Sequence, residues 1–381
     1  MLKCRTNGIF AKRALVLSVL WFTSLGAAEK PAWQSDWDTT LQAAKKEGQI
    51  MIYAAIGPYH PGIFAQFQVA FPEIKVTLAH GNSSRISPRL MAERRAGKYL
   101  ADIYMGGPTS LYGFLKNQLF DPLAPQLILP EILDTSLWWE GKHFYIDAER
   151  KYIFVNEGSV SGFAISYNTQ MAKAAEFKSY WDIFQPKWKG RIVSLDARDP
   201  GFGASELRYL YYHPELGPEF IRRFFGEMDV HLSREPQQAI DWLGVGKFAL
   251  CGFCRDGFVT RAKKQGVPVD YVVPNEVKEM PRLRGSASAI TLVNRAPNPN
   301  AAKVFINWFL SRRGQIVYQE SHGDRDSMRV DIPKEKVPAA QRRIAGKKYF
   351  FVEGPEYMDV KPALKIVEDA LAGKPRARTP D

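Results

Sequence analysis

The sequence predicts an α/β protein built in two halves. Residues 49–117 alternate buried strands and helices in the order strand, helix, strand, helix, strand, helix. A second strand–helix alternation follows residue 190, and the apolar stretch 286–293 comes after it. Such alternation favours parallel strands joined by right-handed crossovers, so each half should hold its own sheet. The chain length of 381 residues also suits two domains at roughly 100–200 residues each.

The N-terminus has the three parts of an export signal. Four basic residues precede the short apolar run 14–22, and the small residues 26–28 offer a cleavage site. The run is too short for a permanent bilayer-spanning helix, although an uncleaved anchor is the alternative. We predict a signal peptide over residues 1–28, cleavage near Ala28 and a mature chain in the periplasm.

The charge of the chain favours anionic partners. The formal net charge is +12, and loss of four basic signal residues leaves +8 on the mature chain. The basic residues are scattered and no nucleic-acid-binding motif accompanies them, so no nucleic-acid partner is expected.

In the first half, each element has a local reason. Ile63, Phe64 and Phe67 give one helix an apolar face at the 3.6-residue period, and Pro72 ends it. Gly48 ends the helix before it. The expected strands are 50–55, 75–79 and 101–105, and the expected helices are 38–47, 61–71, 87–96 and 111–117.

The middle of the chain is less regular. Residues 121–150 are rich in Pro and Trp and poorly periodic, which indicates a surface connection. Strands 151–155 and 163–167 should run through a hinge, and the stretch 162–204 is expected to cross between the halves.

The second half repeats the alternation before the chain returns. The expected strands are 191–195, 248–251, 269–273 and the returning strand 286–293. The expected helices are 205–212, 218–226, 236–244, 257–266, a long amphipathic helix capped by Asn300, and 358–371.

Two stretches carry a resemblance to a known family. In the first, Tyr167-Asn168 is followed by Trp181-Asp182, Pro186-Lys-Trp-Lys-Gly190 and a strand ending in Asp196. In the second, a returning strand ends in Val293-Asn294 and a helix ends near Gly314-Gln315. This order resembles the periplasmic solute-binding proteins of ABC transporters. The resemblance covers nearly all of the mature chain and is nearest to the ferric-ion-binding branch.

The resemblance implies a type II, Venus-flytrap α/β fold with two lobes, a mixed sheet in each and a strand hinge. It implies residues 29–158 in the first lobe and 159–283 in the second. Residues 284–381 would form the return strand and C-terminal helices packing on the first lobe. It further implies a monomer without enzymatic activity that delivers a small ligand to an ABC transporter permease and its ATPase.

Five loops should line the site, because ligands of open α/β sheets bind beyond the carboxyl ends of the strands. These loops are 56–60, 81–85, 106–110, 196–204 and 252–256. Gly, Ser, Asn and Pro are also ordinary turn residues, so plain turns are the alternative. The predicted ligand contacts are Tyr59, His60, Ser83, Ser84, Arg85, Gly107, Thr109, Ser110, Asp199, Phe202, Gly203, Ala204 and Arg255.

The residue types in these loops predict a small organic anion that bears a carboxylate, phosphate or phosphonate. Arginine suits bidentate capture of such groups, and Arg85, Arg198, Arg208 and Arg255 lie in or beside the loops. The backbone N–H groups at the helix start 203–205 would hold oxyanion oxygens.

No metal or cofactor is predicted. The six histidines show no close metal-ligand spacing. In the resemblance, His60 stands only loosely for an iron-binding histidine, Gly106-Gly107 replaces a carboxylate, and Cys254-Arg255 falls where two tyrosines would be. We therefore expect the fold without the iron site, and ferric-ion transport remains the alternative.

Two cysteines remain after the signal, in Cys251-Gly-Phe-Cys254. A disulfide, a redox site and two free thiols are all open. An exported thiol oxidoreductase is the less favoured reading, because Gly252-Phe253 and Gly257 delay the helix that would activate the first cysteine. The chain also lacks P-loop, Gly-x-Ser-x-Gly and His-Glu-x-x-His motifs of enzymes.

Overall fold

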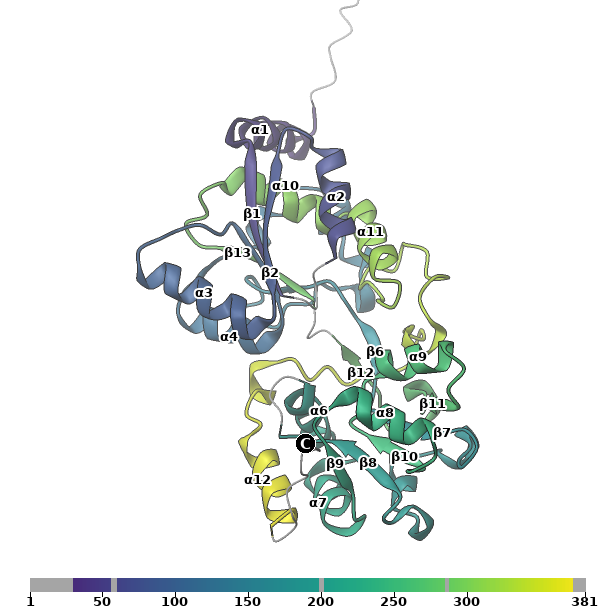
Figure 1. Ribbon diagram of the computed structural model, residues 1–381. Helices are drawn as coiled ribbons and strands as arrows, with labels where there is room; N and C mark the ends of the chain where they lie inside the picture. Colours follow the sequence, from purple (N-terminus) through teal and green to yellow (C-terminus); the bar gives the residue numbers. More distant parts are fainter. Residues whose placement is uncertain (1–29, 56–59, 199–201, 285–287, 373–381) are drawn as a thin grey trace, which may run out of the picture.

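The computed structural model describes residues 30–55, 60–198, 202–284 and 288–372. Two α/β lobes lie one above the other, each with its own sheet and its own apolar core (Figure 1). Both sheets mix parallel and antiparallel strands, which confirms the predicted two-lobed fold with a mixed sheet in each lobe. The predicted signal peptide, residues 1–28, lies outside the described residues.

The sheet of the first lobe has the strand order β2-β1-β3-β13-β4, with β5 also paired to β13. β1, β2 and β3 are parallel, and β13 runs antiparallel to β3, β4 and β5. The strands are β1 (Gln49–Ala55), β2 (Lys75–Gly81), β3 (Ile103–Gly106), β4 (Phe120–Asp121), β5 (Phe154–Val155) and β13 (Ala289–Val293).

The helices of the first lobe cover this sheet. α1 packs on α10, and α11 packs on α2 and α10. Glu47 at the end of α1 accepts hydrogen bonds from the backbone N–H groups of Asn300 and Ala301, so it supplies the cap of α10 that we predicted for Asn300. The helices are α1 (Ala32–Glu47), α2 (Pro61–Ala70), α3 (Ser83–Arg95), α4 (Pro108–Lys116), α5 (Pro130–Leu133), α10 (Pro299–Leu310) and α11 (Arg312–His322).

The segment 121–150 is not only a surface connection as predicted. Ile132 and Trp138 are buried in the first core, and the indole N–H of Trp138 donates to the Ile132 carbonyl at 3.0 Å. Ile132 lies on the four-residue helix α5 (Pro130–Leu133), and Trp138 lies between two short 3₁₀ turns. Elements as short as these have no periodic pattern to predict them.

The sheet of the second lobe has the order β11-β7-β10-β8-β9. β8, β9 and β10 are parallel, whereas β7 runs antiparallel to β10 and β11. Its strands are β7 (Ile165–Asn168), β8 (Ile192–Leu195), β9 (His231–Ser233), β10 (Leu250–Gly252) and β11 (Val269–Tyr271). Its helices are α6 (Phe202–Tyr212), α7 (Gly217–Glu227), α8 (Pro236–Gly244), α9 (Asp256–Lys264) and α12 (Lys361–Ala370).

The chain passes between the lobes before the stretch 162–204 that we expected to cross. A two-stranded antiparallel ribbon of β6 (Ser159–Ser161) and β12 (Arg282–Arg284) joins the lobes (Figure 1). The stretch 162–204, which we expected to cross, lies within the second lobe, because Phe163, Tyr180 and Trp188 are buried in the second core.

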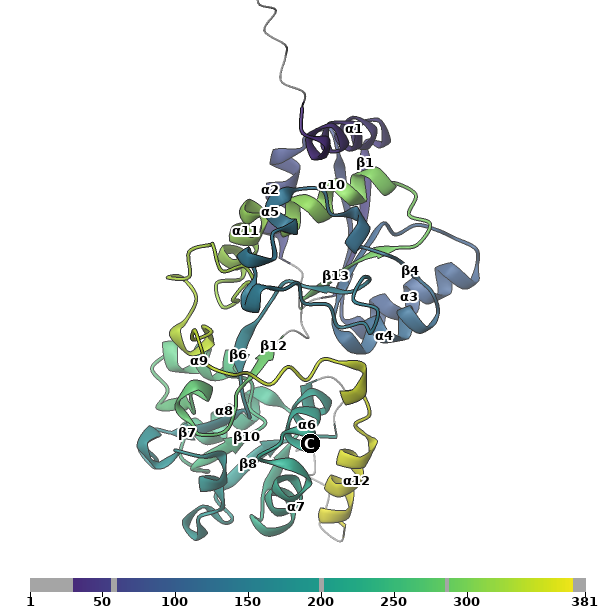
Figure 2. The same cartoon turned by 180° about the vertical axis from the view of Figure 1, so that it is seen from behind.

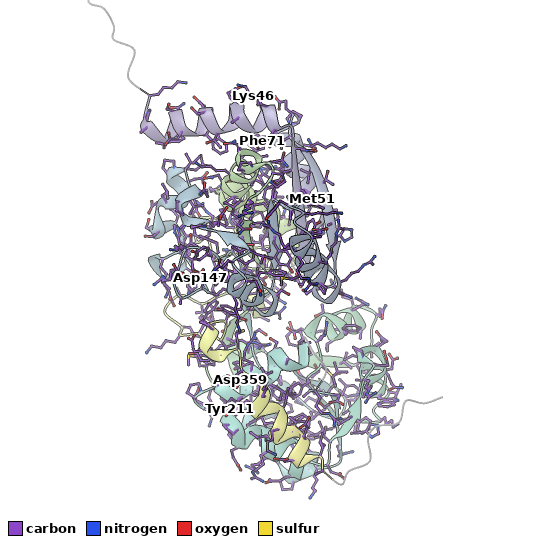
Figure 3. All side chains as sticks on the ribbon, turned by 90° about the vertical axis from the view of Figure 1, so that its left-hand side faces the viewer. Lys46, Met51, Phe71, Asp147, Tyr211 and Asp359 are labelled. Carbon is purple, nitrogen blue, oxygen red and sulfur yellow. A yellow bond between two sulfur atoms is a disulfide. The ribbon has the colours of Figure 1, made fainter. Side chains whose placement is uncertain are left out.

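The C-terminal segment crosses between the lobes once more (Figure 2). Tyr349 and Phe351 pack against the first core, whereas Phe350 and Val352 belong with the second, as expected for an extended segment with alternating side chains. Beyond it, α12 packs on α6 and α7, and the Tyr212 hydroxyl of α6 donates to the Asp359 carbonyl at 2.9 Å. Figure 3 shows Asp359 and Tyr211 in the second lobe. The C-terminal helices therefore do not all pack on the first lobe as expected, since α12 is an element of the second.

Within the described part of the chain, no helix is both long enough and apolar enough to cross a membrane.

Candidate ligand-binding site

The first-lobe edge consists of the carboxyl ends of β1, β2 and β3 and the starts of α2, α3 and α4, namely His60, residues 81–85 and residues 106–110. His60 is the N-cap of α2, where its Nδ1 accepts the Gly62 N–H at 3.2 Å. The acceptor role of Nδ1 leaves the proton of the neutral ring on Nε2, which makes Nε2 a donor. The His60 ring also lies 5.4 Å from the His322 ring, edge to face.

Further along this edge, Asn82 precedes α3 and Gly107 precedes α4. Ser83 is half-buried and Arg85 is exposed in the first turn of α3. No described carboxylate lies within ion-pair distance of Arg85. Tyr59 and Asp199 lie outside the described residues, as do the side chains of Ser84 and Thr109, so four predicted contacts receive no geometry.

A chain of hydroxyl groups joins α3 to α4. The Ser87 hydroxyl donates to Ser110 at 2.9 Å and lies 3.1 Å from the Tyr104 hydroxyl. Because Ser87 gives its one proton to Ser110, Tyr104 must donate to Ser87, and the Ser110 proton remains at the end of the chain. Burial raises the pKa of Tyr104, which keeps its hydroxyl protonated. Ser110 was predicted, whereas Ser87 and Tyr104 were missed because we read them only as parts of a helix and a strand.

The second-lobe edge consists of the carboxyl ends of the parallel strands β8, β9 and β10 with the starts of α6, α8 and α9, namely residues 196–198, 202–205, 233–236 and 252–256. Asp196 follows β8, and its carboxylate accepts Arg198 Nε at 2.8 Å and Nη2 at 2.6 Å. Burial alone raises the pKa of Asp196, but hydrogen bonds from the Arg198 side chain and backbone outweigh it and lower the pKa. Asp196 is therefore an ionised partner of Arg198.

The first turn of α6 lies against the β8 turn. Gly203 is buried, and a Cβ atom there would lie 2.6 Å from the Ala197 carbonyl oxygen, so only glycine fits. Ala204 is half-buried in the same turn. The guanidinium of Arg255, at the N-cap of α9, stands 4.7 Å from the centre of the Phe202 ring. The structure thus brings Phe202, Gly203, Ala204 and Arg255 together.

Buried charges fix α6 to the hinge. Glu206 pairs with Arg282 of β12, which also donates to the Ser205 carbonyl at 3.1 Å. Burial raises the pKa of Glu206, although the Arg282 charge opposes this. Because an unpaired charge would be costly at this depth, the pair holds the α6 start in a fixed relation to β12.

Arg208 is an anchor rather than a ligand contact. It is buried and pairs with Glu353 at 3.0 Å. The Glu353 carbonyl accepts from the Tyr112 hydroxyl of α4 at 2.7 Å. This chain of contacts ties α4 of the first lobe to α6 of the second, and both figures show α4 on the side of its lobe that faces α6 (Figures 1 and 2).

The described charges of the second-lobe edge and of the adjoining hinge strand favour an anion. Asp256 pairs with Arg284 of β12 at 3.1 Å, and Asp196 is occupied by Arg198. No described carboxylate pairs with Arg255. Arg234 and Arg284 were not among the predicted contacts, although Arg234 directly follows β9 and Arg284 ends β12. The charged side chains here are Arg198, Arg234, Arg255 and Arg284 against Asp196, Glu235 and Asp256.

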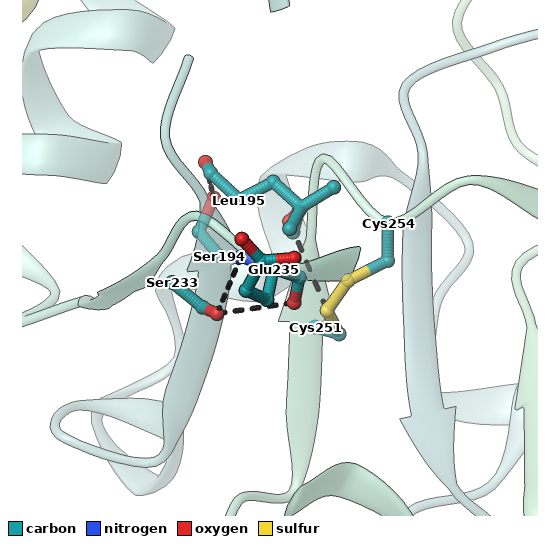
Figure 4. Close-up of a disulfide and its surroundings, with 7 residues drawn as sticks. Ser194, Leu195, Ser233, Glu235, Cys251 and Cys254 are labelled. Atoms are coloured by element: carbon teal, nitrogen blue, oxygen red, sulfur yellow. Dashed lines mark hydrogen bonds between the residues drawn. A yellow bond between two sulfur atoms is a disulfide. The ribbon is translucent and has the colours of Figure 1, made fainter. Parts of the chain in front are cut away.

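The two cysteines form a disulfide at the end of β10 (Figure 4). Cys251 is 0% exposed and Cys254 is 2% exposed, and both belong to the second core. α9 begins only at Asp256, so the first cysteine does not start a helix as redox-active cysteines commonly do. Burial of both sulfurs keeps them away from a substrate thiol.

A hollow of about 200 Å³ lies elsewhere on the second lobe, along β7 and β11. Tyr167, Phe177 and Tyr271 are among its lining residues, and none of the predicted contacts is. Among the described residues, no three His, Cys, Asp or Glu side chains are placed to hold a metal ion.

The two-lobed fold of the chain is similar to solved structures of other proteins. Iron-bound HitA from Pseudomonas aeruginosa matches with a TM-score of 0.57 at 16% identity, over 84% of this chain and 99% of HitA. The ferric binding protein from Campylobacter jejuni matches with a TM-score of 0.60 at 17% identity, over 84% of this chain and 99% of that protein. The chain has the fold of the type II periplasmic binding proteins.

A third structure with the binding-protein fold holds a different ligand. AfuA from Actinobacillus pleuropneumoniae, with exogenous fructose-6-phosphate bound, matches with a TM-score of 0.58 at 14% identity, over 85% of this chain and 98% of AfuA. No family model matches the sequence. Likeness at these identities establishes the fold alone, so the ligand must be argued from the residues of the two edges.

Proposed function

We propose that the chain is the substrate-binding component of an ABC uptake transporter and captures a small organic anion between its two lobes. The binding-protein fold supports the transport role, since the structures it resembles include iron-bound and sugar-phosphate-bound proteins. The protein would act in the periplasm as a monomer, without catalysis, and deliver the ligand to a permease and its ATPase.

The choice of an anion rests on one observation, namely that the Arg255 guanidinium has no carboxylate partner among the described residues. This guanidinium lies over Phe202 at the start of α6. Asp196 and Asp256, the described acids of the turns 196–198 and 252–256, are already paired with Arg198 and Arg284. An exposed arginine beside a helix N-terminus provides donors for a carboxylate or a phosphoryl group.

On the first lobe, donors also predominate. The Ser110 hydroxyl, the His60 Nε2–H and the Arg85 guanidinium are the described groups, and the starts of α3 and α4 add backbone N–H groups. A ligand with one acidic group on Arg255 and several hydroxyl groups toward the first lobe would use both edges.

Calorimetric titration tests the proposal. The panel would hold inorganic phosphate, fructose 6-phosphate, a phosphonate, organic acids, ferric citrate and a polyamine. We expect binding among the organic anions. Arg255→Ala should weaken it about tenfold or more, because a hydrogen bond to a charged group contributes about 1.5–3 kcal/mol.

The matched control is Arg261→Ala, which removes the same charge from the exposed part of α9. It should leave the affinity unchanged. Binding of ferric ion or of the polyamine, with all the anions silent, would overturn the proposed ligand class while leaving the fold intact.

A further inference from the structure

The turn after β10 has an unusual backbone. Cys251, Gly252, Phe253 and Cys254 are closed into a ring by the disulfide, whose Cα atoms are 5.8 Å apart (Figure 4). Phe253 has φ of +55°, a left-handed conformation that costs an ordinary side chain about 1–2 kcal/mol. Such a conformation persists only where the surroundings impose it.

Ring packing, a backbone hydrogen bond and the disulfide impose this conformation. The Phe253 ring is buried 5.2 Å from the Phe163 ring and also packs on Phe224. Gly252 has no room for a Cβ atom because the Phe224 ring occupies the space. The Cys254 N–H donates to the Ala164 carbonyl at 3.3 Å, and the disulfide closes the remaining side of the turn.

Arg255 follows this turn directly. Its neighbour on one side, Cys254, is tied to Cys251, and its neighbour on the other, Asp256, is paired with Arg284 of β12. Between these two fixed points the exposed Arg255 side chain reaches the Phe202 ring. The backbone from which the Arg255 side chain extends is therefore fixed on both sides, and the Phe202 ring is the contact of its guanidinium.

We propose that the Cys251–Cys254 disulfide is a positioning device for ligand binding, which holds Arg255 toward the anion at the start of α6. This inference rests on the proposed function, and it gives the disulfide a role that transport as such does not require. A ring of so few residues constrains the unfolded chain less than a long loop does, and both cysteines are already in the core. The main effect of the bond is thus on the local conformation of the turn.

The test compares wild type with Cys251→Ala/Cys254→Ala, with Arg255→Ala and with the triple variant. Alanine keeps the buried positions apolar. The probes are inorganic phosphate and fructose 6-phosphate, titrated by calorimetry. We expect the double alanine variant to bind about tenfold more weakly, and the triple variant to bind no more weakly than Arg255→Ala alone. Such non-additivity is the signature of two changes that act through one group.

A second readout separates positioning from general stability. Backbone hydrogen exchange should become faster in residues 253–258 and 202–206 of the double variant, with α1 of the first lobe unchanged. If the double variant does not fold, wild type reduced by a phosphine is titrated instead, with its free thiols counted by alkylation and mass measurement.

The possible outcomes separate the positioning role from the proposed ligand class. A double variant that binds the probes as tightly as wild type, or weakening that persists in the Arg255→Ala background, would overturn the positioning role alone. A wild type that binds neither probe would overturn the role of the disulfide in holding Arg255 toward a phosphoryl group. If the phosphonate and the organic acids of the panel were silent as well, the proposed ligand class would fall with it.

Discussion

At the scale of single residues, the site depends on how closely backbone segments approach one another. Gly203 allows the first turn of α6 to approach the Ala197 carbonyl, where a Cβ atom would be only 2.6 Å from the oxygen. The approach places the N–H groups of α6 beside the end of β8, where an anion is expected.

Gly203→Ala should lower the free energy of unfolding by about 1–3 kcal/mol, because the added methyl group must displace backbone. Chemical denaturation measures this. Gly257→Ala is the matched control, since nothing lies within 4 Å of a Cβ atom there and alanine favours a helix. Equal effects of the two substitutions would show that α6 can shift without cost.

Lys334 gives the stability a pH dependence of known sign. Burial lowers its pKa to about 8, although the Asp326 carboxylate, 2.7 Å away, opposes the shift. Between that value and the ordinary value of 10.5, the unfolded chain binds more protons than the folded chain, so stability rises with pH over this interval.

Lys334→Met removes this titrating group. We expect the difference in unfolding free energy, wild type minus variant, to increase from pH 8 to pH 10 in urea denaturation series. Parallel stability curves for the two proteins over this range would contradict the assigned environment of Lys334.

Some residues of the candidate site were selected from residue type alone. Arg255 and Gly203 were predicted because arginine and a glycine-rich helix start are recognisable next to predicted strands. The pairing of Arg208 with Glu353 could not be predicted, since the two residues are 145 positions apart and meet only in the folded chain. Ser87 and Tyr104 were missed because we read them only as parts of a helix and a strand.

At the scale of elements, the crossing segment 349–352 packs alternate side chains against the two cores. Val352 is fully buried in the second core. Val352→Ala should lower the free energy of unfolding by about 2 kcal/mol, because two buried methyl groups are lost. Val245→Ala, at a position 80% exposed, should change it by less than about 0.5 kcal/mol.

Thermal and chemical denaturation would measure both variants. A Val352→Ala protein as stable as wild type would show that the crossing segment does not hold the second lobe.

Helices whose apolar residues repeat at the helical period were predictable, whereas very short strands were not. α8 was predicted at its observed bounds, because Ala239, Ile240 and Leu243 form one apolar face after Pro236. The hinge strands β6 and β12 have only three residues each, too few for a pattern, and were not predicted as a pair. An apolar face shows that α12 packs on a core, but it does not show which of the two cores, so the packing of α12 on the second lobe could not be predicted.

At the scale of the whole molecule, the alternation of strands and helices was enough to predict two α/β lobes. The resemblance in the two stretches was enough to predict the binding-protein fold, which the structure and the solved structures share. In our proposal the ligand contacts a few side chains at the two edges, and such side chains vary freely on one fold.

Native mass spectrometry of the protein purified from the periplasm tests the central claim most directly. It reports the start of the chain, the oligomeric state and any bound small molecule together. We predict a monomer that begins near Glu29 and carries one small organic anion, released on denaturation and identified by its mass. A monomer that instead carries ferric ion or a cationic solute would contradict the account.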